Sequence, residues 1–219
     1  MGEHQEIDIK SFSYEEFVSF VFDHEVPSGQ AKYHPWYFDV EVAFDPGRVC
    51  EFYIRLFRNP GFLLEKYSKP QLEKGFWAIH GAAFDCSAQH LIWDEDLPFA
   101  LRSDCIRSMS VLFKQLFARE PLETTVFMWW DSLCYEWESG NKDRQRGGED
   151  MLMQDVIFEV LADLLQGSSE VCQDAALHGL GHLHHPETKK LIKNYIEQRP
   201  LLTKERKEYA LSAACFDIQ

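Results

Sequence analysis

One predicted helix near the end of the chain carries the residues best suited to chemistry. Asp174, His178, His182 and His185 line up on one helical face at positions i, i+4, i+8 and i+11. Two histidines four residues apart can chelate one metal ion. The metalloprotease pattern H-E-x-x-H adds a glutamate base beside the first histidine, but Gly179-Leu180-Gly181 fills that interval here. The spacing therefore allows a metal site without supplying a base. Solvent exposure, or hydrogen bonds to acids of the next helix, is the simpler interpretation.

A second, looser group of reactive side chains lies near a predicted helix break in the first half of the chain. It consists of His80, Asp85, Cys86 and His90. Their spacing fits no metal-binding template. Cys86 could pair with either histidine as a thiolate, but a cysteine buried in a helical core is inert unless something lowers its pKa. Phosphate-binding loops, dinucleotide fingerprints and the serine elbow motif are absent from the sequence.

Aromatic side chains concentrate in a third region, where Trp129, Trp130, Tyr135 and Trp137 fall within nine residues. Tryptophan and tyrosine dominate the energetics of protein interfaces, although core packing is the alternative role. Neighbouring positions of a helix point about 100° apart. One of Trp129 and Trp130 is therefore expected in the core and the other partly exposed. We take Trp130 as a partner-binding candidate, together with Asp174, His178, His182 and His185.

Caps and proline breaks divide the C-terminal stretch into three predicted helices. Ser169 can accept a hydrogen bond from a backbone N–H of the first turn, and Glu170 follows at the positive end of the helix dipole. Small residues then recur every three to four positions and predict a buried stripe along which neighbouring helices pack closely. Pro186 and Pro200 end the first two helices, and Thr203 caps the third.

This stretch, about residues 169–218, resembles HEAT-like repeats, in which the pattern A-x-x-x-L-G-x-L-x-x-P leads into a second amphipathic helix. The residues that carry the resemblance are Ala176, Leu180, Gly181, Leu183 and Pro186, followed in the next unit by Ala210, Ala213 and Ala214. The resemblance implies an all-α fold of stacked antiparallel helix pairs, a HEAT-like α-α superhelix. HEAT-like proteins mostly bind other macromolecules, so the resemblance implies binding while saying little about activity.

Helices separated by short breaks are predicted for the rest of the chain. Ser13 with Glu16, and Ser68 with Gln71, match the capping pattern of a helix N-terminus. Only residues 33–44 look extended, because they are aromatic and β-branched with partial alternation. No partner strand is evident, so we expect at most a minor extended segment there, packed as an irregular arm.

Residues 138–150, ESGNKDRQRGGED, contain no apolar side chain and cannot contribute to a core. We therefore expect a helical domain over 1–137, a polar linker or loop over 138–150, and HEAT-like helices over 151–219. No clean repeat period is visible in the first domain, whose helices are either degenerate repeats or an irregular bundle. The first and last parts can also form one continuous domain.

Charge and composition restrict the possible partners. The 219 residues include 36 acidic and 22 basic side chains, a net charge of −14, which repels phosphate backbones and favours a basic partner over nucleic acid. Charges interrupt the apolar runs before the 18 or so residues that a membrane span needs, and the polar start does not match a signal peptide. Six scattered cysteines without a C-x-x-C pair are expected as reduced core residues. We expect a cytoplasmic protein without a membrane association or a cofactor.

Two functions follow from these patterns. The first is a non-catalytic protein-binding module with an acidic surface, an immunity-type or scaffold protein that binds a basic partner. The second is a metal-dependent enzyme that uses the face of His178 and His182. If the Ala/Gly stripe faces inward, that face lies on a groove or the outer surface. Replacing both histidines by alanine is then expected to weaken partner binding while shifting the melting temperature by only a few degrees.

Overall fold

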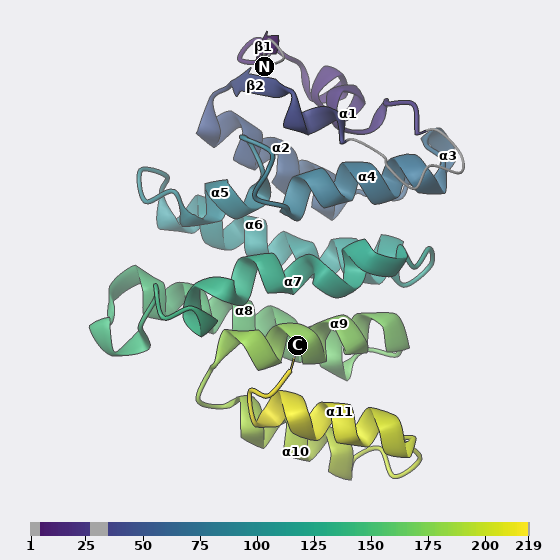
Figure 1. Ribbon diagram of the computed structural model, residues 1–219, viewed down its shortest axis with the longest axis vertical. Coiled ribbons are helices and arrows are strands. Elements are labelled where there is room, and N and C mark those ends of the chain that lie inside the picture. Colours follow the sequence, from purple (N-terminus) through teal and green to yellow (C-terminus); the bar gives the residue numbers. More distant parts are fainter. Residues whose placement is uncertain (1–4, 27–34, 219) are drawn as a thin grey trace. The chain divides into compact units, whose positions relative to one another are not determined.

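The fold is all-α, as the sequence predicts. The computed structural model describes residues 5–26 and 35–218, and it is 67% helical. The chain divides into two compact units, Met1–Ser108 and Met109–Gln219. The boundary falls inside helix α6 (Phe99–Leu112), and each unit is described by itself below (Figure 1).

The first unit consists of short helices and one small sheet. Its elements are β1 (Gln5–Asp8), α1 (Tyr14–Phe22), the 3₁₀ turn η1 (Trp36–Phe38), β2 (Val40–Ala43), α2 (Pro46–Arg58), α3 (Leu63–Lys66), α4 (Lys69–His80), α5 (Ala88–Trp93) and the beginning of α6. Helix α4 packs against α1 and α5, and α2 also packs against α5. Aromatic rings fill this core, among them Phe17, Phe22 and Phe76, all almost fully buried.

The predicted caps form as local hydrogen bonds. The backbone N–H of Glu16 donates to Ser13 Oγ at 3.3 Å, while the N–H of Ser13 donates to the Glu16 carboxylate at 2.7 Å. Ser68 and Gln71 make the equivalent box at the start of α4. Each box satisfies backbone donors that have no partner within the helix, which confirms these helix starts.

The extended segment is present, but the expectation that it lacks a strand partner was wrong. Within the described part of residues 33–44, η1 is followed by β2, and β2 pairs in parallel with β1, Gln5 opposite Val40. Tyr33 and His34 lie outside the described residues. A four-residue strand such as QEID gives almost no periodic signal of its own, because its stability comes from pairing with a segment about 35 residues away.

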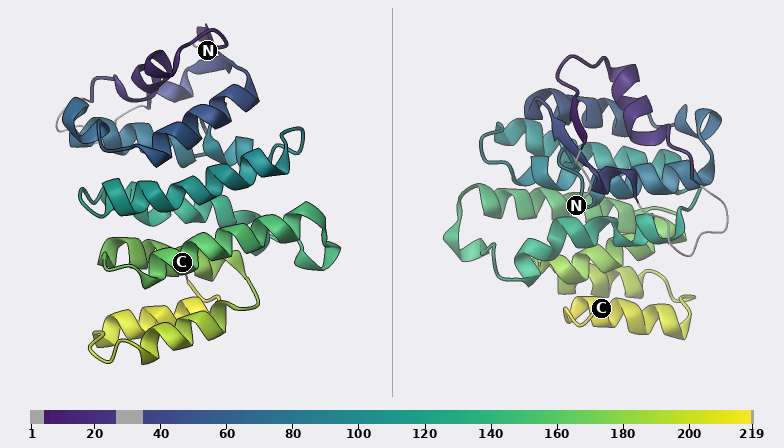
Figure 2. Two further views of the ribbon diagram at one scale, coloured as in Figure 1. Left: turned by 180° about the vertical axis from the view of Figure 1, so that it is seen from behind. Right: turned by 45° about the horizontal axis from the view of Figure 1, so that its top comes forward.

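The second unit is built around helix α9. Its elements are the π-helical turn η2 (Phe113–Phe117), α7 (Glu123–Glu138), the 3₁₀ turn η3 (Arg144–Arg146), α8 (Gly148–Gln166), α9 (Glu170–Leu183), α10 (Thr188–Glu197) and α11 (Lys204–Ala214). Helix α9 contacts α7, α8, α10 and α11. Figures 1 and 2 show α8 beside α9 and α10 beside α11, so that these helices follow one another as two neighbouring pairs.

Glycines bring the neighbours of α9 close, as its small-residue stripe predicts. A Cβ atom at Gly179 would lie 2.5 Å from Cβ of Trp130, and one at Gly181 would lie 2.2 Å from the Ile218 side chain. Atoms cannot approach so closely, so Gly179 is needed for this packing, whereas at Gly181 the end of the Ile218 side chain could move aside. The contact between Gly179 and Trp130 allows the close approach of α7 and α9.

Residues 138–150 lie inside the second unit. Their polar composition suggests a linker between two domains, but the structure divides after Ser108. They form the end of α7, the turn η3 and the start of α8. Lys142 and Asp150 form an ion pair at 2.7 Å, and Arg144 contacts Asp155 at 2.6 Å. Because ion pairs and backbone turns can order a segment without apolar contacts, a polar composition did not reveal that this connection is folded against α8.

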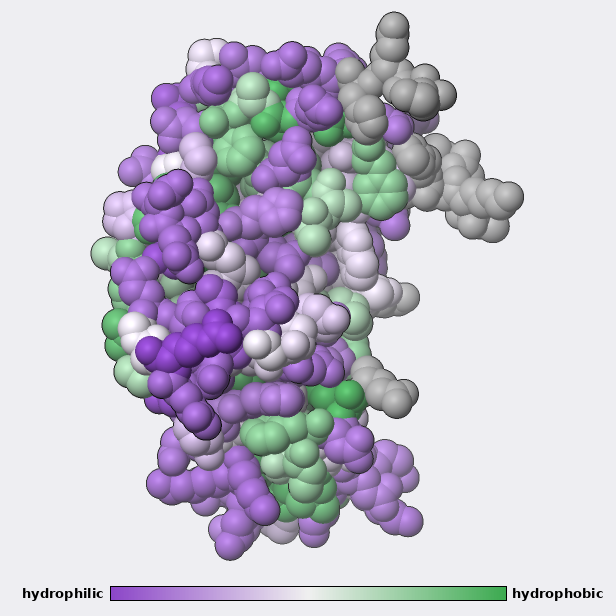
Figure 3. Space-filling view, turned by 60° about the vertical axis from the view of Figure 1, so that its left-hand side comes forward, coloured by the Kyte–Doolittle hydropathy of each residue, from purple (hydrophilic) through white to green (hydrophobic). Residues whose placement is uncertain are grey.

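The surface is largely hydrophilic on the face drawn in Figure 3, where purple residues predominate and green ones form smaller patches. Among the described residues, no helix is both long and apolar enough to cross a membrane. All six cysteines are unpaired thiols, five of them buried and Cys215 exposed. This agrees with the expectation of reduced core cysteines, apart from Cys215.

Candidate functional site

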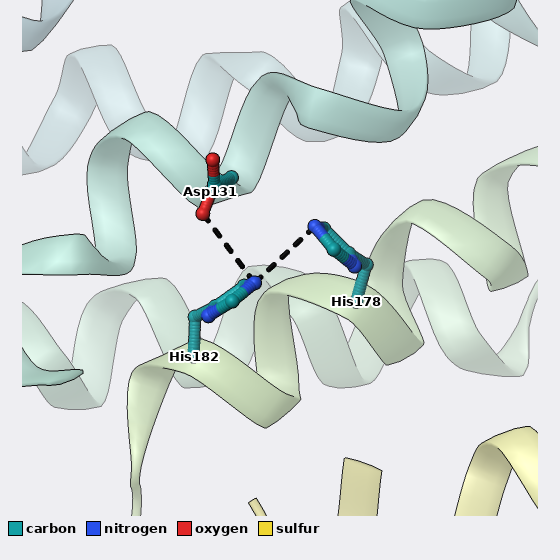
Figure 4. Close-up of side chains that lie close together, drawn as sticks. All are labelled: Asp131, His178 and His182. Carbon is teal, nitrogen blue, oxygen red and sulfur yellow. Dashed lines mark hydrogen bonds and ion pairs between the residues drawn. The ribbon is translucent and has the colours of Figure 1, made fainter. Parts of the chain in front are cut away.

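Three potential metal ligands meet between α7 and α9 in the second unit. Asp131 comes from the middle of α7, and His178 and His182 lie one turn apart near the end of α9 (Figure 4). Ser169 fixes the start of α9 by accepting a hydrogen bond from the Cys172 N–H. From that start, the helical period places both imidazoles on the side of α9 that faces Asp131.

The donor atoms of this cluster lie close together. Nε2 of His182 is 3.3 Å from Nε2 of His178 and 3.4 Å from Oδ1 of Asp131. The three ligand atoms all lie within 4.8 Å of one another. The two imidazole rings are nearly perpendicular, with centroids 4.6 Å apart. Nε2 of His182 is therefore close to both of the other ligand atoms, as Figure 4 shows.

The outer nitrogens of both imidazoles are held by polar partners. Nδ1 of His182 makes a very short contact with the Glu138 carboxylate. An ionised carboxylate only accepts hydrogen bonds, so His182 donates to it through Nδ1–H. Nδ1 of His178 lies 2.9 Å from the hydroxyl of Tyr209 on α11. These contacts orient both rings and direct their Nε2 atoms towards Asp131.

Burial controls the electrostatics of the cluster. Desolvation, and then the neighbouring His182, lower the pKa of His178 from 6.5 to about 4, so this imidazole is neutral at pH 7. Desolvation raises the pKa of Asp131, as does the nearby Glu138, whereas His182 opposes the increase. The Phe127 ring lies 4.2 Å from the His178 ring and covers it. A neutral imidazole is the form that binds a metal ion.

The expected location of the histidine face was wrong. His178 and His182 are only 1% and 6% exposed, instead of lying on a groove or the outer surface. The expectation of one partly exposed tryptophan also fails, because both Trp129 and Trp130 are fully buried. The reason is that α9 is covered by four helices. An inward stripe of small residues therefore does not leave the opposite face in solvent.

The other predicted residues do not join this cluster. Asp174 is half-exposed and pairs with Arg206 of α11 at 2.8 Å. His185 is buried, lies 2.9 Å from Asp155 and stacks on Phe158 with ring centroids 4.0 Å apart. Of the four residues predicted on one face, only His178 and His182 are brought together.

Sequence reasoning missed the carboxylates that complete the cluster. Asp131 and Glu138 are seven residues apart on α7, hence on the same side of that helix two turns apart. Asp131 lies in the aromatic segment that was interpreted only as core or interface, and Glu138 is the first residue of the predicted polar linker. Two acids at i and i+7 in a helix rich in aromatic residues are a signal that could have identified them, although it does not name the helix they face.

The earlier group around Cys86 does not form a reactive pair. Burial raises the pKa of the Cys86 thiol, which keeps it protonated. The Asp85 carboxylate accepts a hydrogen bond from the Val42 N–H of β2 at 2.8 Å. His90 contacts the backbone oxygen of Asp85. These residues connect the loop before α5 to the small sheet.

Comparison with known proteins identifies no family. No family model, curated protein or solved structure matches this chain. The resemblance of residues 169–218 to HEAT-like repeats therefore stays a prediction, and the interpretation of the site rests on its own geometry.

Proposed function

We propose that this chain is a non-catalytic protein-binding module that binds a basic protein through its acidic surface, as a scaffold or an immunity-type protein does. The observation that carries the proposal is the net charge of −14. A charge of this size steers a basic partner towards the protein and repels nucleic acid. Opposite charges on the partner would increase the rate at which it associates and would favour it over other proteins.

We infer a HEAT-like arrangement for the second unit from the sequence resemblance and the packing of α9. HEAT-like units are stacked helix pairs, and here α8 and α9 are followed by the pair α10 and α11. Gly179 and Gly181 allow the close helix contacts that the small-residue stripe predicts. Successive helix pairs present an extended surface to a partner, which suits a binding module.

The test is purification of the partner from the native host, followed by a salt titration of the isolated complex. We expect one basic protein, whose affinity falls at least tenfold between low and physiological salt because exposed charges are screened. Binding that is insensitive to salt would contradict the proposal.

Matched charge variants test the sign of the interaction. Glu95 and Asp96 are exposed acids of the first unit, and Lys189 and Lys190 are exposed bases of the second. Replacing Glu95 by Gln and Asp96 by Asn together is expected to slow association. The control, Lys189→Gln with Lys190→Gln, removes as much charge and is expected to leave association unchanged or faster. The reverse order would indicate an acidic partner.

A metal-dependent enzyme is the alternative, and the cluster of Asp131, His178 and His182 is the observation that favours it. A hydrolytic metal enzyme also needs a general base beside the metal-bound water. Glu138 is the carboxylate next to the cluster, but it accepts the Nδ1 proton of His182. With its base so engaged, the cluster fits a metal-holding role better than hydrolysis.

A further inference from the structure

We propose that Asp131, His178 and His182 bind one Zn²⁺ ion, and that Glu138 positions His182 from outside the coordination sphere. The site holds α7 against α9. It is independent of the binding function proposed above, since a structural metal site serves an enzyme or a binding module equally well. Three features lead to it: the spacing of the ligand atoms, the position of the imidazole protons and the access to solvent.

Two of the three distances between the ligand atoms match those of a tetrahedral ion, and all three atoms lie within 4.8 Å of one another. With Zn–N and Zn–O bonds of about 2.0–2.1 Å, neighbouring ligands of a tetrahedral zinc lie about 3.3–3.4 Å apart. The observed distances from His182 Nε2 are 3.3 Å to His178 Nε2 and 3.4 Å to Asp131 Oδ1. An octahedral ion with bonds of about 2.1 Å would bring adjacent ligands to about 3.0 Å. Two imidazoles and one carboxylate are also a donor set that zinc accepts.

The contact of His182 with Glu138 leaves Nε2 of the ring available to a cation. Because Nδ1–H donates to Glu138, the neutral ring has a lone pair on Nε2. That lone pair faces the Asp131 oxygen at 3.4 Å, and two electron-rich atoms so placed repel each other. A cation between them converts this repulsion into two bonds. A metal-bound histidine usually donates its other ring N–H to a carboxylate or a similar acceptor, which holds the orientation of the ring.

His178 can present its Nε2 lone pair in the same way. Its Nδ1 lies 2.9 Å from the Tyr209 hydroxyl, which can accept the Nδ1 proton. The Phe127 ring packs on one side of the imidazole and restricts its rotation. His178 is thus oriented by α7 and α11, just as His182 is oriented by Glu138.

Solvent reaches the cluster from the side of α7. The side chains of Asp131 and Glu138 are 29% and 38% exposed, whereas that of His182 is 7% exposed. An ion can therefore enter past the carboxylates, and a water molecule can occupy the fourth position. Zinc sites with three protein ligands keep such an open position.

Zinc titration of the full-length chain, after dialysis against a chelator, tests the site. We expect one Zn²⁺ per chain by elemental analysis and calorimetry, and a higher melting temperature with zinc because the metal binds only the folded state. Co²⁺ in place of zinc is expected to give the intense visible bands of tetrahedral coordination. A folded wild-type chain that binds no zinc would overturn the proposal.

Ligand variants locate the ion. His182→Gln is expected to abolish zinc binding, but it can also impair folding because the residue is buried. Asp131→Asn avoids this difficulty, because the side chain is partly exposed and keeps its shape, and it is expected to weaken zinc binding at least tenfold. A folded Asp131→Asn variant with wild-type zinc affinity would overturn the proposal.

Glu138→Gln tests the positioning role. We expect a 10- to 100-fold loss of zinc affinity, the usual cost of removing an outer-shell carboxylate, with a tetrahedral Co²⁺ spectrum retained. The melting temperature without metal should change little, which separates positioning from a merely structural role. An unchanged zinc affinity in this variant would contradict the assignment of Glu138.

Two controls lie in the same unit. His185 and Asp155 form another pair of a buried histidine and a carboxylate, with only one imidazole. His185→Gln is expected to leave zinc stoichiometry and affinity unchanged. Cys215 is the exposed thiol of the chain, so Cys215→Ser is expected to retain the zinc. Loss of zinc with Cys215→Ser, or a thiolate band in the Co²⁺ spectrum, would place the metal elsewhere and overturn the proposal.

Discussion

Helices α4 and α9, one in each unit, use the same two residue types in different ways. Each places a glycine against an aromatic side chain, Gly75 against Phe22 in α4 and Gly179 against Trp130 in α9. Each also buries a histidine near its C-terminal end. His80 of α4 lies against the Trp77 ring, with centroids 4.8 Å apart, whereas the histidines of α9 meet carboxylates and a tyrosine hydroxyl.

The difference shows that neighbours, more than burial, decide what a histidine can do. Burial lowers the pKa of His80 to about 3 against the opposing effect of a backbone hydrogen bond, so its imidazole is neutral at any ordinary pH. Beside α9 the α7 carboxylates Asp131 and Glu138 favour a cation next to the rings. Carboxylates beside a buried histidine make it a candidate ligand.

The largest expected effect concerns the aromatic contact of α9. Trp130→Ala should lower the free energy of unfolding by about 3–5 kcal/mol, because a fully buried side chain is removed. Urea denaturation followed by far-UV circular dichroism measures the loss. Trp130→Phe fills most of the space and should cost much less. A stable Trp130→Ala variant that fails to bind its partner would restore the interface role that the sequence suggested.

The double replacement of His178 and His182 by alanine should cost about 3 kcal/mol. It removes two buried side chains together with their hydrogen bonds to Tyr209 and Glu138. The same denaturation experiment, done without metal, measures it. His90→Ala, at an exposed position of the first unit, is the control and should cost under about 0.5 kcal/mol. An equally small effect for both variants would mean that the α9 histidines are exposed.

Acid should weaken the first unit through His80. Its pKa is 6.5 when unfolded and about 3 when folded, so below pH 6.5 the unfolded state binds more protons. Stability from this source therefore decreases as the pH falls from 6.5 towards 3, by about 2 kcal/mol at pH 5. Denaturation of the wild type and His80→Gln at pH 7 and 5 measures it, and the variant should lose less stability. Equal losses would show that His80 is not buried in its neutral form.

The smallest expected effect compares the two glycines. Gly179→Ala should cost about 1–2 kcal/mol, because the new methyl meets Cβ of Trp130, which moves only with the backbone of α7. Gly75→Ala should cost less, because the new methyl meets the Phe22 ring, which can rotate. Gly61→Ala, with no atom near its added Cβ, is the control and should be close to neutral. Thermal melts of the three variants test this order.

The sequence by itself determined the helical class and many helix ends. Ser13, Ser68, Ser169 and Thr203 cap helices where their spacing predicts, because a cap is a hydrogen bond between residues three positions apart. The small-residue stripe of α9 likewise predicted close packing, which Gly179 confirms. Such features depend on the chain within one or two helical turns, so a local pattern is enough to predict them.

Only the tertiary structure decided what the histidines of α9 face. The helical period placed His178 and His182 together, but it could not show that α7 would cover them with Asp131 and Glu138. His182 and Glu138 are 44 residues apart in the chain, and Tyr209 reaches His178 from α11, 31 residues away. Periodicity describes the faces of one helix, whereas burial and ligand sets arise where the faces of different helices meet.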